Sequence, residues 1–358
     1  MKLVLVTILA LSVVPLLLAG TLDIHQLRML AAKNNVTCIF VFGDSSVDPG
    51  NNNRLRTTFK GNFPPYGKDF PNGLPTGRFS DGRLATDFIA EAAGFTKAIP
   101  AFLDPKLKRE DLLHGISFAS AASGYDDLTA NLSSVLPVSK QLEYFKHYKI
   151  HLRQLVGVKR AEEIVTTAIF ILSMGTNDFL QNYYLETIRA KQYNVEEYQN
   201  YLVSRIIYAG FVQEMHRLGA RRLVVVGVPP LGCLPLMKTL MDQTTCVESY
   251  NKVAFSFNSK IQEKLHIVRR VLGIRNGYLD IYTMIADAVN NPKKYGFTET
   301  TKGCCGSGIL EYGLSCKGMT TCADPSKYVF WDAVHPTQRM YQIIADEGLQ
   351  ALNRYVFS

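Results

Sequence analysis

Ser45 is the first residue of this chain whose setting suggests chemistry. It follows the β-branched and aromatic stretch 37–42 and the pair Gly43-Asp44. That stretch is typical of a buried strand. A serine at the C-terminal end of a buried parallel strand lies where α/β sheets place their reactive groups. Ser45 is therefore a candidate nucleophile, and the simpler interpretation is that it caps a helix.

A serine nucleophile needs a base, and His335 is the best placed of the seven histidines. Asp332 precedes it by three residues in the segment 330–337, FWDAVHPT. Residues three apart on a turn lie on the same side. Asp332 can therefore accept a hydrogen bond from one ring nitrogen while the other nitrogen faces the serine. The simpler interpretation is a surface ion pair.

Two more strand ends carry groups that can stabilise a negatively charged oxygen. Gly124 closes a run of very small residues, 120–124, after the second predicted strand. A backbone N–H can approach a ligand closely at such a position. Asn177 follows the third predicted strand and offers a side-chain NH₂, a donor that oxyanion holes use. The alternatives are a turn at Gly124 and a helix cap at Asn177.

These residues lie in a regular alternation of predicted strands and helices. Buried strands are predicted at 37–42, 114–119, 168–173, 223–228 and 278–282. Helices are predicted at 84–93, 136–156, 198–218, 247–271 and 337–352, and 27–32 is a short helix or linker. Such alternation indicates right-handed βαβ units and a parallel sheet covered on both faces. We expect one three-layer α/β/α domain over residues 21–358 with five parallel strands. The stretch 47–77 is rich in Pro, Gly and Asn, which predicts a long surface loop beside Ser45.

Composition narrows the function classes. The chain has 358 residues, 47% of them hydrophobic, with a formal charge of +8 and a pI near 9.0. The basic residues are scattered and lack interleaved aromatics, so we predict no nucleic-acid partner. Residues 1–20 combine Lys2, an apolar run and small residues near Ala19, the pattern of a secretory signal peptide. An uncleaved anchor is the alternative, and no later stretch is apolar enough to cross a bilayer.

Export changes the interpretation of the cysteines. Six of the seven lie late in the chain: Cys233, Cys246, Cys304, Cys305, Cys316 and Cys322. In an oxidising compartment they can form up to three disulfides, with Cys233–Cys246 the plausible local pair and the other pairings open. Zinc is the rival for the last four, but adjacent cysteines without a nearby histidine suit it poorly, so no metal site is predicted. Cys38, inside the first strand, is predicted to be a buried, inert thiol.

Two sequons agree with export. Asn35-Val36-Thr37 and Asn131-Leu132-Ser133 are candidate N-glycosylation sites. Asn131 lies in a polar, loop-like stretch and is the better acceptor, whereas Asn35 adjoins a buried strand.

Taken together, these motifs resemble those of the plant GDSL esterase/lipases, members of the SGNH hydrolases. The segment 42–46, FGDSS, with 48–52, DPGNN, is similar to the family signature. The segments 115–124, 175–178 and 332–337 are similar to its later blocks. Ser46 stands where the motif has the leucine that names it. Ala121 and Ala122 stand where some relatives carry glycine, so the second-block assignment falls on Gly124.

The resemblance implies an SGNH, flavodoxin-like fold and a secreted serine ester hydrolase. It implies that Ser45 is the nucleophile, His335 the base and Asp332 its orienting partner. Ser45, Gly124 and Asn177 would form the oxyanion hole, with no cofactor. The expected substrates are carboxylic esters, above all lipid acyl esters. Alternatives are an acyltransferase, a polysaccharide deacetylase, or a non-catalytic secreted binding protein.

Overall fold

A five-stranded parallel sheet forms the centre of the molecule. The computed structural model describes residues 24–207 and 210–357, so the predicted signal peptide at 1–20 lies outside the described residues. The strand order is β2-β1-β3-β4-β5, the flavodoxin-like order. The strands are β1 (Ile39–Gly43), β2 (Gly115–Ser117), β3 (Ile169–Ser173), β4 (Arg222–Val226) and β5 (Arg275–Leu279). The predicted α/β class and the parallel sheet are confirmed.

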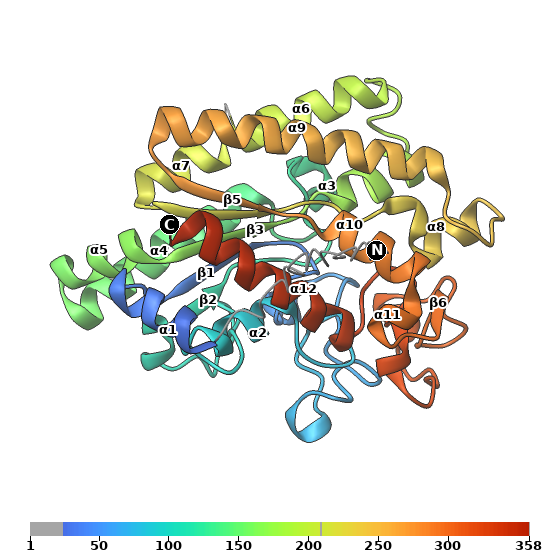
Figure 1. Ribbon diagram of the computed structural model, residues 1–358, viewed down its shortest axis with the longest axis horizontal. Helices are drawn as coiled ribbons and strands as arrows, with labels where there is room; N and C mark the ends of the chain where they lie inside the picture. The colour runs from blue at the N-terminus through green and yellow to red at the C-terminus, as the bar shows by residue number, and fades with distance from the viewer. Residues whose placement is uncertain (1–23, 208–209, 358) are drawn as a thin grey trace, which may run out of the picture.

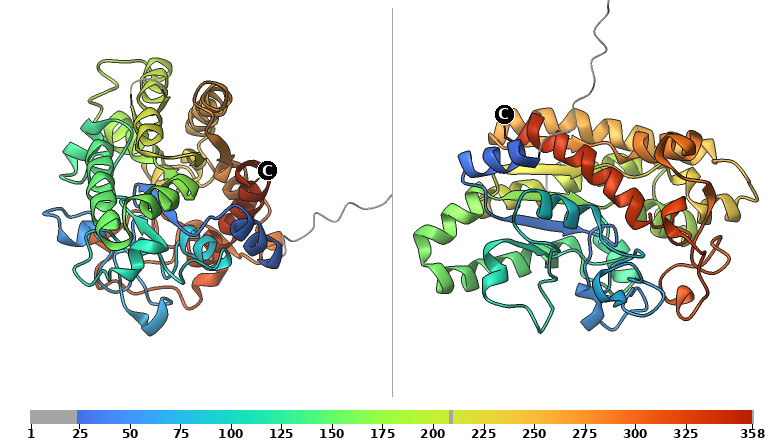
Figure 2. Two further views of the ribbon diagram at one scale, coloured as in Figure 1. Left: turned by 90° about the vertical axis from the view of Figure 1, so that its left-hand side faces the viewer. Right: turned by 60° about the horizontal axis from the view of Figure 1, so that its bottom comes forward.

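Helices cover both faces of this sheet (Figure 1). On one face pack α4 (Val138–Val156), α5 (Val158–Thr167), α6 (Val195–Ile207), α7 (Phe211–Leu218) and α9 (Glu248–Leu272). On the other pack α1 (Ile24–Lys33), α2 (Ala85–Ala92), α10 (Ile281–Asn290) and α12 (Gln338–Ala351). The two groups of helices flank the sheet when the molecule is turned (Figure 2).

The inner strands are apolar on both faces because both faces are covered. All five residues of β1 and of β3 are buried. Phe40 and Phe42 point to the same face because side chains alternate along a strand. Their rings lie 5.1 and 5.7 Å from the ring of Phe145 on α4. Aromatic contacts of this kind fix how α4 sits on the sheet.

Several element boundaries differ from the predicted ones. The predicted helix 198–218 is two helices, α6 and α7, and Gly210, with φ −151° and ψ −118°, precedes α7. The last predicted strand lies three residues too late. Asp280 caps α10 by accepting a hydrogen bond from Thr283 N, and so ends β5 at Leu279.

Shorter elements gather near the carboxyl ends of the strands. They include α3 (Asp127–Leu132), the π-helical segment Asp178–Leu185, α8 (Pro235–Leu240) and α11 (Pro292–Tyr295). A second, two-stranded sheet pairs β6 (Glu299–Gly303) with β7 (Tyr328–Phe330). The chain ends in the π-helical segment Leu352–Val356, which packs against β5.

Three disulfides tie the late part of the chain. Cys233 pairs with Cys246, as expected, and the remaining bridges are Cys304–Cys322 and Cys305–Cys316. Cys38 is buried and unbridged, and burial raises the pKa of its thiol. An unreactive thiol is the expected consequence.

Both candidate glycosylation residues are exposed. Asn35 has a positive φ of 53° just before β1. Asn131 lies in the last turn of α3 and not in a loop, which corrects the prediction for its surroundings. Within 24–207 and 210–357, no helix is both long and apolar enough to cross a membrane.

Candidate active site

The turn after β1 presents Ser45 at the carboxyl edge of the sheet. Gly43 has φ +154°, and a Cβ there would lie 2.0 Å from the Ser173 carbonyl oxygen of β3. Only glycine allows this close approach. Asp44 N then donates to the same carbonyl, at 3.0 Å, and turns the chain so that Ser45 follows at the edge.

Ser45, His335 and Asp332 form one hydrogen-bonded series. Ser45 Oγ lies 2.8 Å from His335 Nε2, although 290 residues separate them. His335 Nδ1 lies 2.9 and 2.8 Å from the two carboxylate oxygens of Asp332. With Nδ1–H donating to the carboxylate, Nε2 is left to accept the serine proton. All three residues are buried.

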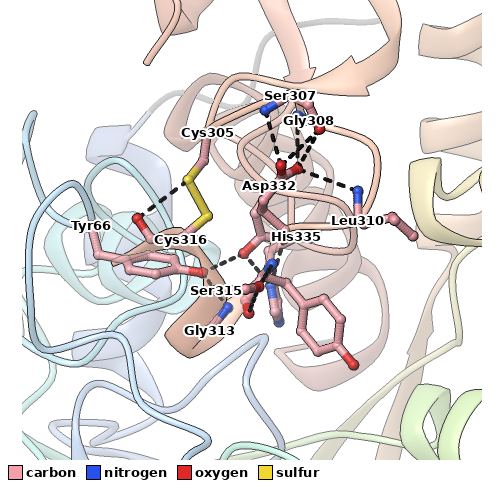
Figure 3. Close-up of a disulfide and its surroundings, with 12 residues drawn as sticks. Tyr66, Cys305, Ser307, Gly308, Leu310, Gly313, Ser315, Cys316, Asp332 and His335 are labelled. Carbon is pink, nitrogen blue, oxygen red and sulfur yellow. Dashed lines mark hydrogen bonds and ion pairs between the residues drawn. A yellow bond between two sulfur atoms is a disulfide. The ribbon is translucent and has the colours of Figure 1, made fainter. Parts of the chain in front are cut away.

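The Asp332 carboxylate is itself held from several directions. Its Oδ1 accepts from the backbone N–H groups of Val334 and His335, at 2.8 and 2.7 Å. Its Oδ2 accepts from the Tyr66 hydroxyl at 2.7 Å, and Gly313 N donates to that hydroxyl at 2.7 Å. These contacts fix both oxygens, so the imidazole has a single orientation. Figure 3 shows this network.

Tyr66 is a functional candidate that the sequence did not reveal. It is buried beside Trp331 and Phe79, with ring centroids 6.2 and 5.5 Å away. Burial raises the pKa of its hydroxyl, so it remains a neutral donor to Asp332. The Cys305–Cys316 disulfide lies next to it (Figure 3) and belongs to the same buried cluster.

Asn177 lies beside Ser45, whereas Gly124 faces elsewhere. Asn177 Nδ2 donates to the Ser123 carbonyl at 2.9 Å. The C=O and N–H of a trans peptide point in opposite directions, so the Gly124 N–H points away from the Asn177 amide. A Cβ at Gly124 would lie 2.2 Å from a carboxylate oxygen of Asp178. Gly124 therefore packs against Asp178 and does not line the cavity around Ser45.

Ala122, two residues before Gly124, lies at the cavity around Ser45. It lines the same cavity as Ser45 and Asn177. The Ala121 carbonyl accepts from Asn52 Nδ2 at 3.0 Å. The Ala122 N–H, on the opposite side of that peptide, therefore points away from Asn52. Ala122 has φ +66°, a conformation that glycine favours.

Comparison with known proteins now decides the family. The family model described as GDSL-like Lipase/Acylhydrolase matches residues 39–347. The chain belongs to the GDSL esterase/lipase family.

Relatives in this GDSL family cover nearly the whole chain. The Arabidopsis thaliana protein GDSL esterase/lipase At5g45950 is 56% identical over 344 residues, 96% of each chain. GDSL esterase/lipase At4g26790 from the same plant is 44% identical over 317 residues, 87% of this chain and 90% of its own. The resemblance inferred from the motifs is thereby confirmed.

Solved structures of esterases are more distant. An acetylxylan esterase mutant, Axe2 from Geobacillus stearothermophilus, matches 88% of this chain and 94% of its own at 13% identity, with a TM-score of 0.40. A GDSL-like lipase from Parabacteroides merdae matches 89% of this chain and 96% of its own at 14% identity, with a TM-score of 0.36.

Asp48 and Asn51, which follow Ser45 in the GDSL signature, hydrogen-bond to the backbone of residues 117–121, just before Ala122. Asp48 Oδ2 accepts from Ala121 N at 3.0 Å, and Asn51 Nδ2 donates to the carbonyls of Ser117 and Ala119 at 2.9 and 2.8 Å. Asp48 and Asn51 are fully buried, so this part of the stretch 47–77 is not the surface loop that composition suggested. The sequence does carry a signal for this, because Asn51, Asn52 and Asn53 are three consecutive short side chains that can each hydrogen-bond to backbone groups. The overall Pro, Gly and Asn content of the stretch hides that signal.

Asp178, the last residue of the third GDSL block, holds the other end of that turn. Its carboxylate accepts from Tyr125 N at 2.8 Å, Asp126 N at 3.1 Å and the Thr129 hydroxyl at 2.6 Å. Burial raises the pKa of Asp178 to about 7 and that of Asp44 to about 6. Asp178 thus holds the backbone at 125–126 in place beside Asn177. Asp332 holds the His335 ring in a similar way.

Throughout the residues that the structure describes, no group of three or more His, Cys, Asp or Glu side chains could hold a metal ion. The histidine next to Ser45 instead has a carboxylate on one nitrogen and a hydroxyl on the other.

Proposed function

We propose that this protein is a serine ester hydrolase that forms an acyl-enzyme on Ser45. The observation that carries the proposal is the hydrogen-bonded series from Ser45 Oγ through His335 to Asp332, with 2.8 Å between Oγ and Nε2. This separation lies within the reach that proton transfer from a nucleophile to its base requires. Family membership supports the same reaction class.

The proposed reaction has two halves. His335 Nε2 takes the Ser45 proton as Oγ attacks the ester carbonyl, and the tetrahedral oxyanion forms among the donors beside Ser45. His335 then returns the proton to the leaving alcohol. In the second half His335 deprotonates a water molecule, which attacks the acyl-enzyme and releases the acid.

Covalent labelling tests the proposal directly. A fluorophosphonate probe should label the full-length secreted protein once, and peptide mass spectrometry should locate the label on Ser45. The same preparation should hydrolyse 4-nitrophenyl butyrate. Labelling of a different residue, or no labelling of folded protein, would contradict the proposed nucleophile.

For the oxyanion hole we propose the N–H groups of Ser45 and Ala122 together with Asn177 Nδ2, with Ala122 in place of Gly124. Incorporating lactic acid at position 122 removes that N–H and keeps the side chain. Loss of one such donor is expected to lower kcat about 10²- to 10³-fold. Glycolic acid at 124 is the matched control and should have a much smaller effect. If glycolic acid at 124 lowered kcat more than lactic acid at 122 did, Gly124 and not Ala122 would be the donor.

The Tyr66 hydroxyl is proposed as a positioning group for Asp332. Tyr66→Phe keeps the ring and deletes one hydrogen bond to a carboxylate, at 2.7 Å in the structure. The loss of such a bond, about 1.5 kcal/mol, should lower kcat about tenfold and leave KM nearly unchanged. Tyr355→Phe, at an exposed tyrosine, is the control. A variant with a lower melting temperature but an unchanged kcat would limit Tyr66 to a structural role.

We further propose lipid acyl esters as substrates and the cell exterior as the place of action. The apolar run at 1–20, the exposed sequons at Asn35 and Asn131 and the three disulfides support export. Residues 21–358 would then form the mature single-domain enzyme. No cofactor or nucleic-acid partner is part of the proposal.

A further inference from the structure

Residues 305–316 form a loop that the Cys305–Cys316 disulfide closes, and we call it the bridged loop. Both cysteines are fully buried and belong to the same apolar cluster as Tyr66 and Trp331. Figure 3 shows the disulfide next to the proposed catalytic residues. The bridge therefore lies in the core around the candidate active site and not at the outer surface.

The first end of the bridged loop, with the two residues before it, contacts the chain at and just before Asp332. Cys304 N and Cys305 N both donate to the Trp331 carbonyl, each at 2.8 Å. Gly303 packs against Asp332 itself, since a Cβ at Gly303 would lie 2.6 Å from the Asp332 carbonyl oxygen. These contacts hold the main chain that leads into Asp332.

The middle of the bridged loop contacts the chain just after Asp332. Ala333 N donates to the Glu311 carbonyl at 2.9 Å. The Glu311 carboxylate holds the shape of the loop, because it accepts from Ser307 N at 3.2 Å, the Ser307 hydroxyl at 2.8 Å and Gly308 N at 3.1 Å. The backbone is thus held on both sides of Asp332 by one loop.

The far end of the bridged loop acts on the Asp332 side chain. Gly313 N donates to the Tyr66 hydroxyl, and that hydroxyl donates to Asp332 Oδ2, each at 2.7 Å. Because the Tyr66 oxygen accepts from Gly313, its own proton is directed to the carboxylate. Gly313 begins the short helical turn Gly313–Cys316, so the disulfide at Cys316 fixes the place of this N–H.

We propose that the Cys305–Cys316 disulfide positions Asp332 for catalysis, because it holds the bridged loop on both sides of this residue. The turnover number kcat then depends on the bridge, in addition to the stability of the fold. The inference rests on the proposed function, since Asp332 is the carboxylate that orients His335 in the proposed reaction.

The neighbouring disulfide, Cys304–Cys322, does not replace this bridge. Its cysteines are 18 residues apart, and it ties the chain outside the bridged loop on both sides. Without the Cys305–Cys316 bond, Gly313 would lie in the middle of this longer loop. A displacement of about 1 Å takes Gly313 N, 2.7 Å from the Tyr66 oxygen in the structure, out of hydrogen-bonding distance.

Removal of the bridge should therefore lower kcat. Cys305→Ala/Cys316→Ala should reduce kcat on 4-nitrophenyl butyrate about 10- to 100-fold, as for the loss of a hydrogen bond to a charged group, with KM nearly unchanged. Cys233→Ala/Cys246→Ala is the matched control, because its cysteines are 13 residues apart, against 11 for the first pair. Both variants should lose a similar amount of melting temperature. The control should keep kcat within about threefold of the parent.

A double-mutant cycle tests whether the bridge acts through Tyr66. Tyr66→Phe alone should lower kcat about tenfold. In the protein that lacks the Cys305–Cys316 bridge, the same substitution should cost at most about threefold more, because the hydroxyl is already displaced there. Effects that multiply in full would show that the bridge does not act through this hydroxyl and would overturn the proposed path.

Glycolic acid at position 313 tests the same path with the disulfide intact. It removes only the N–H that donates to Tyr66 and should lower kcat about three- to tenfold, with KM nearly unchanged. Glycolic acid at 273 is the control, because it removes an N–H that donates to the Arg269 carbonyl at the end of α9. If the protein without the bridge does not fold, this pair decides, and parental kcat with glycolic acid at 313 would refute the inference.

The outcomes separate failure of the bridge proposal from failure of the proposed function. If the parent hydrolyses butyrate and Cys305→Ala/Cys316→Ala keeps the parental kcat, the positioning role is refuted and the hydrolase remains. An equal loss of kcat in both bridge variants would refute that role as well. If the parent cleaves no ester, the proposed function fails and the positioning role fails with it.

Discussion

Ser45→Ala is expected to lower kcat on 4-nitrophenyl butyrate by at least about 10⁴-fold. The substitution removes the proposed nucleophile, whose hydroxyl is the hydrogen-bond partner of His335 Nε2. A residual rate above that of water should remain, because the proposed oxyanion donors, the N–H groups of residues 45 and 122 and the Asn177 amide, are still present.

The fold should survive this change. The Ser45 side chain makes its hydrogen bond to His335, and the turn around it is held by backbone groups and Asp44. The melting temperature should therefore stay within a few degrees of the parent. Ser259→Ala makes the same change at an exposed serine and controls for differences in expression and purification. Parental activity in folded Ser45→Ala protein would exclude Ser45 as the nucleophile.

Asp332→Asn should cost nearly as much, about 10³- to 10⁴-fold in kcat. The reason lies in the donors around Asp332. Two backbone N–H groups, of Val334 and His335, point at Oδ1, so the asparagine oxygen must take that place. The new NH₂ group then occupies the site of Oδ2, where it faces the Tyr66 hydroxyl and His335 Nδ1.

This arrangement reverses the histidine tautomer. Nδ1 must accept from the asparagine NH₂, so the ring proton moves to Nε2, which then cannot accept the proton of Ser45. Steady-state kinetics should show the loss in kcat and little change in KM. Asp324→Asn, at an exposed aspartate of the same region, is the matched control. An Asp332→Asn enzyme within tenfold of the parent would show that Asp332 does not set the tautomer.

The strands and the groups at their ends were predictable because their signals are local. Short apolar runs ending in Gly43-Asp44 or in Gly175 mark β1 and β3 without knowledge of the rest of the chain. The Asp332–His335 pair was predictable for the same reason, because three residues separate its members. Where a local signal was misjudged, as at Asp280, the error came from a helix cap that resembles the end of a strand.

The supporting contacts were not predictable, because their partners lie far apart in the sequence. Tyr66 reaches Asp332 across 266 residues, and nothing around Tyr66 in its proline-rich stretch indicates a buried hydroxyl. Ala122 illustrates another limit. Asp48 and Asn52 hydrogen-bond to the N–H and the carbonyl of Ala121, and Ala122, which follows, has a φ of +66°. An alanine in the sequence gives no sign of a left-handed backbone, whereas a glycine suggests one.

The distance along the chain between Ser45 and His335 has a consequence for biosynthesis. The proposed nucleophile is synthesised early, but the imidazole that would activate it follows 290 residues later. A nascent or prematurely terminated polypeptide therefore carries the serine without its partner. Under the proposed mechanism, ester cleavage cannot begin until the segment that carries His335 has been synthesised and has packed against Ser45.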